Sequence, residues 1–300
     1  MTSQAKAVQN WAERQQGLAR LTEAQFFFIG GAPRSGTTWL QSLLDSHPDI
    51  SCRGEGLFWK TIAEPLERMM QERRKTLEAK NNSIFRHSGG YPLPESQDTE
   101  FLLRTAILLA LHQQCAGNAY RAIGEKTPEN VFFFPQLKRM FPAAKFIGIA
   151  RDPRDVLTSA WHFFRPPRSQ ENEDANKVDF IRLALPSLQQ GTRTMLALQE
   201  QHQSDCTIIT YERMLEAPAL IAEQLFRFLG VSYSADLVAA CVAKTSFATL
   251  SGGRHAGVEQ NGSFFRSGTA GDWRSTLTPT MNDMILSELG WMFPHFGWQP

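Results

Sequence analysis

The sequence predicts an α/β fold of three layers, in which helices cover both faces of a central parallel sheet. Short runs that suit buried strands alternate with longer amphipathic or charged segments that suit helices. This alternation is typical of parallel strands joined by helical crossovers. The chain of 300 residues has no internal repeat and no low-complexity linker. We therefore expect a single domain, with an N-terminal helix within residues 1–24 and the core of the fold at 25–298.

The elements follow in order from apolar patterning and from turn residues. The expected strands are at 26–29, 51–56, 120–124, 145–150 and 206–211. The expected helices are at 5–21, 39–44, 64–80 and 101–114, from 128 onward, from 153 onward, and at 179–201, 219–229, 235–243 and 279–289. Asp152 before Pro153 gives a strong helix start. We expect Pro186 to break its helix and the glycine-rich stretch 251–274 to be irregular.

Composition excludes several classes of protein. The net charge is +1, whereas nucleic-acid-binding proteins usually carry a marked basic excess. The four cysteines, Cys52, Cys115, Cys206 and Cys241, are scattered, which argues against a zinc site or a disulfide framework. The N-terminus is polar, and no apolar run reaches the ~20 residues of a membrane span. We expect a soluble, cytoplasmic protein with no nucleic-acid or membrane partner.

The most informative stretch follows the first expected strand and reads Gly-Ala-Pro-Arg-Ser-Gly-Thr-Thr-Trp over 31–39. A strand, a glycine turn and a helix N-terminus together present backbone N–H groups to an anion. The spacing is P-loop-like, but Thr37 stands where nucleoside triphosphatases carry a lysine, and Arg34 is the nearby cation. Two interpretations stay open: a phosphate- or sulfate-binding loop, or an ordinary turn whose hydroxyls cap the helix.

Other polar residues fall at the ends of other expected strands. Lys126, Arg151 and Tyr211 each lie at or just beyond such an end. Ligands of open parallel sheets bind beyond the carboxyl ends of the strands. Each residue alone is explained by an ordinary surface contact or a local ion pair. Together with the glycine turn, they predict one anion site at that edge.

Four motifs in this order make the sequence similar to the sulfotransferases that use 3′-phosphoadenosine 5′-phosphosulfate (PAPS). The motifs are 31–39, which resembles the 5′-phosphosulfate loop, 149–159, which resembles the 3′-phosphate motif, 244–247, which matches an adenine-contacting stretch, and 264–274, which resembles the late Gly-x-x-Gly-Asp-Trp motif. The resemblance runs from Gln25 to the C-terminal helix. It implies a P-loop-like α/β fold, PAPS as co-substrate and transfer of its sulfuryl group as the activity.

The resemblance also implies roles for individual residues. Those expected at the 5′-phosphosulfate are Arg34, Ser35, Gly36, Thr37 and Thr38. Those expected at the 3′-phosphate are Arg151, Ser159, Arg266, Ser267 and Gly268. Those expected on the adenosine side are Trp39, Tyr211, Thr245 and Phe247. A co-substrate with several anionic oxygens needs many donors, and bidentate arginines suit its phosphates.

The chemistry of sulfuryl transfer narrows the choice of catalytic residues. Negative charge builds on the leaving oxygen, so we expect Arg34 and Lys126 to stabilise it. A sulfuryl group carries less charge than a phosphoryl group, so we expect no required metal. The acceptor must lose a proton to a base. Glu55 occupies the place of a catalytic glutamate in the tyrosylprotein branch of the family. The alternatives are that Glu55 pairs with Arg53, or that the base is Glu129 or His162.

Three positions depart from the cytosolic branch of that family. Arg34 and Ser267 each replace a lysine, and Pro128 replaces a catalytic histidine. The acceptor therefore stays open. We expect a hydroxyl or amine of a small molecule, with a carbohydrate or tyrosyl acceptor as the alternative. The alternative outside enzymes is a non-catalytic nucleotide-binding protein. The dimer motif of the family is present only in degraded form at 274–283, so a homodimer is left open.

Overall fold

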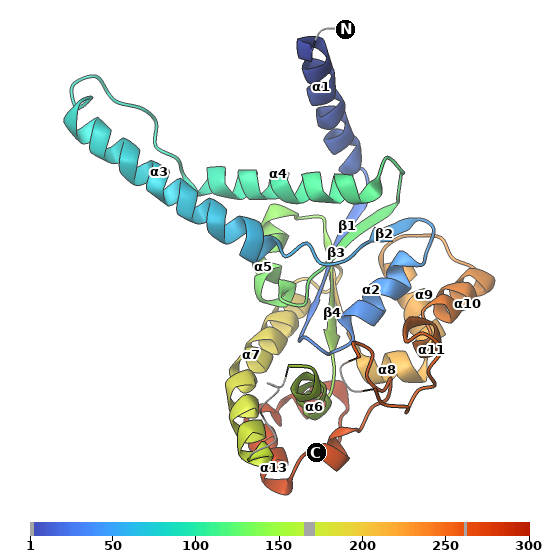
Figure 1. Cartoon of the computed structure of the whole chain (residues 1–300). Helices are drawn as coiled ribbons and strands as arrows, with labels where there is room; N and C mark the ends of the chain where they lie inside the picture. The colour runs from blue at the N-terminus through green and yellow to red at the C-terminus, as the bar shows by residue number, and fades with distance from the viewer. Residues whose placement is uncertain (1–2, 165–171, 261–262) are drawn as a thin grey trace.

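A computed structural model describes residues 3–164, 172–260 and 263–300 of the chain. Its centre is a five-stranded parallel sheet of order β2-β3-β1-β4-β5. The strands are β1 (Gln25–Gly31), β2 (Ile50–Cys52), β3 (Ala122–Lys126), β4 (Lys145–Ala150) and β5 (Cys206–Thr210). Helices cover both faces of the sheet (Figure 1). The predicted three-layer α/β class is confirmed.

The central strand, β1, lies between β3 and β4. Its register pairs Ile29 with Lys126 on one side and Gly31 with Ile149 on the other. The chain passes from β3 across β1 to reach β4, so the strand order changes direction at β1. The loops that leave these three strands meet at their carboxyl ends, which is where ligands bind in open α/β sheets.

Alternate side chains of β1 enter two separate hydrophobic cores, as the two-residue period of a strand requires. Phe26 and Phe28 pack into one core, and Phe27 and Ile29 pack into the other. The helices of the first core are α4 (Ser96–Cys115), α5 (Asn130–Met140), α6 (Pro153–Phe164), α7 (Glu173–Gln201), α13 (Pro279–Leu289) and α14 (Met292–Phe296). The helices of the second core are α2 (Thr37–Asp45), α8 (Tyr211–Glu216), α9 (Pro218–Phe228) and α10 (Ala235–Lys244).

The remaining helices contribute no buried residue to either core, apart from Leu21 at the end of the N-terminal helix. They are α1 (Ser3–Leu21), η1 (Trp59–Ala63), α3 (Glu64–Ser83), α11 (Phe247–Leu250) and α12 (Trp273–Thr276). Helix α1 lies beyond the N-terminal end of β1, while α6, α8 and α11 gather at the opposite end (Figure 1). Within the described residues, no helix has both the length and the apolar character that crossing a membrane requires.

Several expected boundaries differ from the observed ones: β2 ends at Cys52, Tyr211 begins α8, and α7 begins at Glu173. Two further differences have clear physical reasons. Pro186 lies inside α7 without breaking it. Pro186 and Arg182, whose carbonyl loses its helical partner, are both exposed, so water can take the missing hydrogen bond. The third strand extends two residues further than expected, because Glu125 and Lys126 are buried with polar partners. Their charge made them resemble loop residues.

Near the end of the sheet opposite the ligand-binding edge, one carboxylate joins three elements. Asp205, which precedes β5, pairs with Lys138 of α5 at 2.8 Å and with Lys145 of β4 at 3.0 Å. The hydrogen bond from Lys138 is the main cause that lowers the pKa of Asp205 to about 2, and Lys145 adds to it. Asp205 is partly exposed, so solvent screening reduces the stability that these pairs contribute.

We expect Asp205→Asn to lower the free energy of unfolding near neutral pH by roughly 0.5–1 kcal/mol. The native pKa lies below the unfolded value of 3.8, so this contribution is present above about pH 4 and fades as the pH falls toward about 2. Urea unfolding of both proteins from about pH 6 down to about pH 3 measures the difference. A difference that stays constant over this range would contradict the assignment.

Candidate functional site

A cavity of about 500 Å³ lies at the carboxyl end of the sheet, and its volume falls in the ~300–1,000 Å³ range of small-molecule sites. The predicted site residues that line it are Arg34, Gly36, Thr37, Thr38, Trp39, Glu55, Arg151, Ser159, Tyr211, Thr245, Phe247, Arg266, Ser267 and Gly268. Ser35 and Lys126 are buried next to this lining. The structure therefore brings the predicted residues together around one space.

The glycine turn after β1 positions the start of α2 at this cavity. Gly36 has a φ of 97°, which is costly for any residue with a Cβ. A Cβ there would also lie 2.7 Å from the ring of Tyr211. Arg34 adopts a positive φ of 75° as well. Between them, Ser35 is fully buried and its Oγ has no hydrogen-bond partner among the described residues. The tight turn leaves the first N–H groups of α2 facing the cavity.

Three arginines converge on the cavity from separate segments. The pKa of Arg34 is lowered to about 10, chiefly by burial and then by the positive charges of Arg151 and Arg266. Arg34 therefore remains protonated at neutral pH. Like charges held this close in a partly buried site favour an anion between them. The Nε atoms of Arg151 and Arg266 have no partner among the described residues.

The guanidinium of Arg34 lies over two aromatic rings that also contact each other edge-to-face. The rings of Phe163 and Phe264 have their centroids 4.6 Å and 4.8 Å from its Cζ atom. Its Nε donates to Ser159 Oγ at 3.2 Å, and its terminal nitrogen donates to the carbonyl of Phe264 at 2.6 Å. Arg34 therefore contacts a residue predicted for the 3′-phosphate. Its predicted role at the 5′-phosphosulfate stays a prediction.

Arg151 connects the glycine turn to residues 264–274, called the late segment below. It donates to the carbonyl of Arg34 at 3.2 Å and to the carbonyl of Thr269 at 3.0 Å. Its guanidinium also lies 4.2 Å from the ring centroid of Tyr211, which packs edge-on against Trp39. Burial raises the pKa of Tyr211, so its phenol keeps its proton and can donate a hydrogen bond. These contacts make one polar wall of the cavity.

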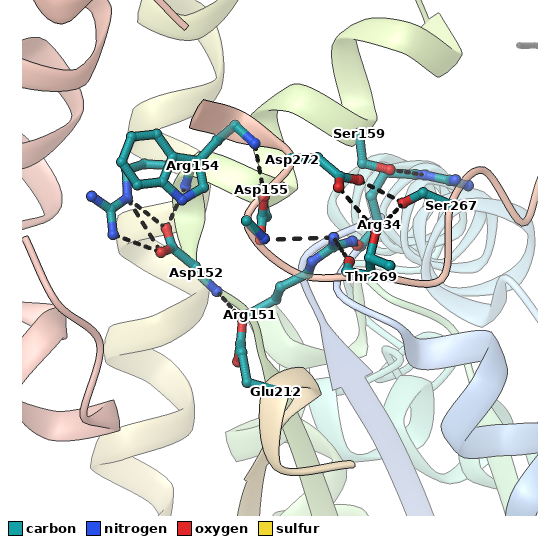
Figure 2. A network of polar contacts seen from close by, with 12 residues as sticks. Arg34, Arg151, Asp152, Arg154, Asp155, Ser159, Glu212, Ser267, Thr269 and Asp272 are labelled. Carbon is teal, nitrogen blue, oxygen red and sulfur yellow. Dashed lines mark hydrogen bonds and ion pairs between the residues drawn. The ribbon is translucent and has the colours of Figure 1, made fainter. Parts of the chain in front are cut away.

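A carboxylate of α6 fixes the late segment against that helix (Figure 2). Asp155 of α6 accepts the backbone N–H groups of Gly271 at 2.7 Å and Trp273 at 3.1 Å. Burial raises the pKa of Asp155, and Arg151 at 3.9 Å opposes this shift. From the sequence, Asp155 is expected near a helix start and within the stretch that resembles the 3′-phosphate motif, but with no role of its own. Its spacing from the Gly-Asp-Trp motif gave no signal that the two would meet.

Two predicted phosphate ligands are already bonded to carboxylates. Arg266 pairs with Glu259 and Asp272, and Ser267 Oγ donates to Asp272. These acids hold the two side chains in place and balance part of the positive charge. Neither Glu259 nor Asp272 was singled out from the sequence, because an acidic side chain in a predicted anion site goes against the simplest expectation.

Arg254 is a further residue that sequence reasoning missed. It donates to the carbonyls of Val258 at 3.0 Å and Arg266 at 2.9 Å, to Ser263 Oγ at 3.0 Å, and to the carbonyl of Phe265. One guanidinium thus joins described residues that precede the late segment to the start of that segment. Its guanidinium also lies over the ring of Phe247, which packs against Gly268.

A second cationic centre lies at the end of β3. Lys126 Nζ donates to Glu55 Oε1 at 2.6 Å and to Thr38 Oγ1 at 3.2 Å. The Lys126 side chain is 3% exposed, whereas that of Glu55 is 39% exposed and lines the cavity. The structure therefore pairs Glu55 with Lys126 instead of Arg53. A carboxylate that is open to the cavity and a buried ammonium beside it can handle a proton and stabilise a developing anion.

The alternative bases differ in position. Glu129 is exposed and lines the same cavity. His162 lies on α6 between Trp161, which is buried, and Phe163, which lines the cavity. Within the described ranges, no group of three or more histidine, cysteine, aspartate or glutamate side chains is arranged to hold a metal ion.

Comparisons with known proteins agree with this geometry. A family model described as "Sulfotransferase family" matches residues 27–235, more than two thirds of the chain. A putative protein-tyrosine sulfotransferase of Caenorhabditis briggsae is 27% identical over 71% of this chain and 68% of its own length. The nodulation protein NoeE of Sinorhizobium fredii is 30% identical over 75% of this chain and 54% of its own length. The chain spans 39% of the Drosophila melanogaster protein-tyrosine sulfotransferase that it matches.

Solved structures share the fold. The sulfotransferase STF9 of Mycobacterium avium aligns with a TM-score of 0.56 at 15% identity, covering 97% of this chain and 82% of that one. The mouse sulfotransferase SULT7A1, solved with PAP, aligns with a TM-score of 0.54 at 18% identity, covering 93% and 88%. Because the family model covers most of the sheet and the glycine turn, the chain belongs to the sulfotransferase family.

Proposed function

We propose that the chain transfers the sulfuryl group of PAPS to a hydroxyl or amine of a small-molecule acceptor. The observation that carries this proposal is the convergence of Arg34, Arg151 and Arg266 on a cavity that is also lined by Glu55, which pairs with the buried Lys126. One part of the site suits an anion with several charged oxygens. The other part suits removal of a proton beside a cation.

The residues present fit such a co-substrate. The buried Nε atoms of Arg151 and Arg266 lack partners among the described residues, and burial and these two cationic neighbours lower the pKa of Arg34, so an anion would satisfy all three arginines. Arg151, Ser159 and Arg266 would hold the 3′-phosphate, and the first turn of α2 would hold the 5′-end. The co-substrate supplies an activated sulfuryl group. The PAP in the solved mouse sulfotransferase supports this choice.

The residues of the chain would divide the work of catalysis. Glu55 takes the proton of the acceptor, because its carboxylate is the part of the ion pair that is open to the cavity. Lys126, buried beside it, stabilises the negative charge that develops on the leaving oxygen. Thr38 accepts a hydrogen bond from the same ammonium and fixes its direction.

The walls of the cavity bear on the acceptor. Phe163, Phe164 and Phe264 are each at least two-fifths exposed and line the cavity. Rings placed in this way suit a flat or apolar acceptor with one reactive hydroxyl or amine. The names of several relatives favour a protein tyrosine as the second candidate acceptor.

The cytoplasmic location remains a proposal, which the four free and buried cysteines support. A homodimer also remains a proposal.

An acceptor panel tests the function. Purified protein with PAPS is expected to release PAP, the desulfated co-substrate, in the presence of small phenols, alcohols or amines. The kcat/KM values are expected to differ between these acceptors. Tyrosine-containing peptides serve as the second arm, and each reaction is followed by mass spectrometry of the sulfated product. Turnover confined to peptides would replace the small-molecule acceptor with a tyrosyl one. PAP binding without turnover on any acceptor would favour a non-catalytic nucleotide-binding protein.

Affinity for the co-substrate is expected to depend on Arg151. Arg151→Ala is expected to weaken PAP binding by roughly 10- to 100-fold, because a charged hydrogen-bond donor to a phosphate is worth about 1.5–3 kcal/mol. Isothermal titration measures the change. Arg182→Ala is the matched control, since Arg182 pairs with Asp179 on the exposed surface of α7, and it should bind PAP like the parent. Equal affinities for the parent and Arg151→Ala would remove Arg151 from the site.

Kinetics of two variants separate the candidate bases Glu55 and Glu129. Glu55→Gln is expected to lower turnover by about 100-fold or more while PAP affinity changes little, because the amide cannot accept the proton. Glu129→Gln is the matched comparison, since that carboxylate lines the same cavity. Steady-state kinetics and titration of both variants give the answer. A large loss in Glu129→Gln with near-normal turnover in Glu55→Gln would transfer the role to Glu129.

A further inference from the structure

The loop that carries Glu55, residues 53–57, is held by three consecutive residues of the neighbouring strand and its extension. The bonded pairs are Glu125 with Gly56, Lys126 with Glu55, and Thr127 with Leu57. β2 ends at Cys52, so this loop lies beyond the ladder of the sheet. Its position therefore depends on side-chain contacts and not on strand pairing.

Glu125 is the buried anchor of these contacts. Its side chain is almost fully buried. One carboxylate oxygen accepts the backbone N–H of Gly56 at 2.8 Å and the hydroxyl of Thr127 at 2.6 Å, and the other accepts the amide of Asn130. A carboxylate has only acceptor sites, so three donors satisfy it where water is excluded. Asn130 also donates to the carbonyl of Ile29, which connects the anchor to β1.

Thr127 passes this anchoring on to the next residue of the loop. Its hydroxyl donates to Glu125 and accepts the backbone N–H of Leu57 at 3.2 Å. Leu57 has a φ of 49°, a conformation that costs energy in a residue with a branched side chain. Such a conformation persists only where neighbouring contacts hold it. The Thr127 hydroxyl is one of those contacts.

Two features of the loop make this support necessary. Gly54 has a positive φ of 58°, and the space where its Cβ would be is open. Arg53 and Gly54 are both exposed. A glycine with no packing beside it gives the chain next to Glu55 wide conformational freedom. The bonds at Gly56 and Leu57 remove that freedom from the other side.

We propose that Glu125 and Thr127 are positioning residues, which hold loop 53–57 so that the Glu55 carboxylate meets both Lys126 and the acceptor. The proposal rests on Glu55 being the base, as proposed above. Glu125 and Lys126 are adjacent in a strand, so their side chains leave on opposite faces. One face secures the loop backbone, and the other secures the carboxylate. A misplacement of about 1 Å at a reacting group can cost roughly 100-fold in rate.

The test uses Thr127, because replacing the more deeply bonded Glu125 endangers folding. Thr127→Val keeps the shape and removes the hydroxyl. We expect it to lower kcat by about 10-fold with PAP affinity unchanged within about twofold. Thr127→Ser, which restores the hydroxyl, is expected to recover most of the loss. Thr192→Val is the matched control, since Thr192 is a buried threonine whose hydroxyl bonds within its own helix, to Leu188.

A double-mutant cycle distinguishes positioning from general structural damage. If Thr127 acts through Glu55, then Thr127→Val in the Glu55→Gln background should change kcat by less than about twofold. A full 10-fold loss in that background as well would overturn the positioning role and leave the base assignment standing. Normal turnover in Glu55→Gln alone would instead overturn the base. Equal losses in Thr127→Val and Thr127→Ser would show that the hydroxyl is not what matters.

Discussion

The constraint on which this site depends is the repulsion among arginines that the fold brings together. Arg34 comes from the turn after β1, Arg151 from the end of β4 and Arg266 from the late segment. Asp155 and Asp272 lie among them and balance part of the charge. Asp155 also holds the late segment against α6, and Asp272 braces that segment from within. The acids therefore serve the fold and the electrostatics together. Enough positive charge remains to favour an anion.

The sheet decides where this charge lies. β1 is central, and the strands on both sides of it end level with the glycine turn. The alternation of side chains along β3 then separates two tasks at one place. Lys126 faces the start of α2 and the Glu55 carboxylate, while Glu125 faces α5. The lysine that pairs with Glu55 and the carboxylate that anchors the loop of Glu55 are thus neighbouring residues of one strand.

Elements whose position depends on nearby residues were predicted correctly from the sequence. The strand at 145–150 and the helix start at Pro153 were correct, because an apolar run and a proline after Asp152 are strong signals. The end of β3 was misplaced, since its two charged residues find partners only in the folded chain. The partners of Asp155 come from the late segment, far along the chain, and their meeting depends on the whole fold. The partners of Arg254 are near it in the chain, but the irregular segment that they form has no periodicity from which to predict them. The direction of Arg34 depends on two rings that no spacing rule connects.

The aromatic contacts of Arg34 have a thermodynamic consequence. Phe163 and Phe264 remove water from the guanidinium as the chain folds, so much of its dehydration cost belongs to folding and not to association. The ligand-free protein is less stable by that amount, and an anion that relieves the repulsion raises its melting temperature by mass action. Thermal shift would therefore report occupancy of this cavity by any nucleotide phosphate, without an assay for the reaction. The melting temperature of the protein is thus expected to rise when a phosphate-bearing ligand occupies the cavity.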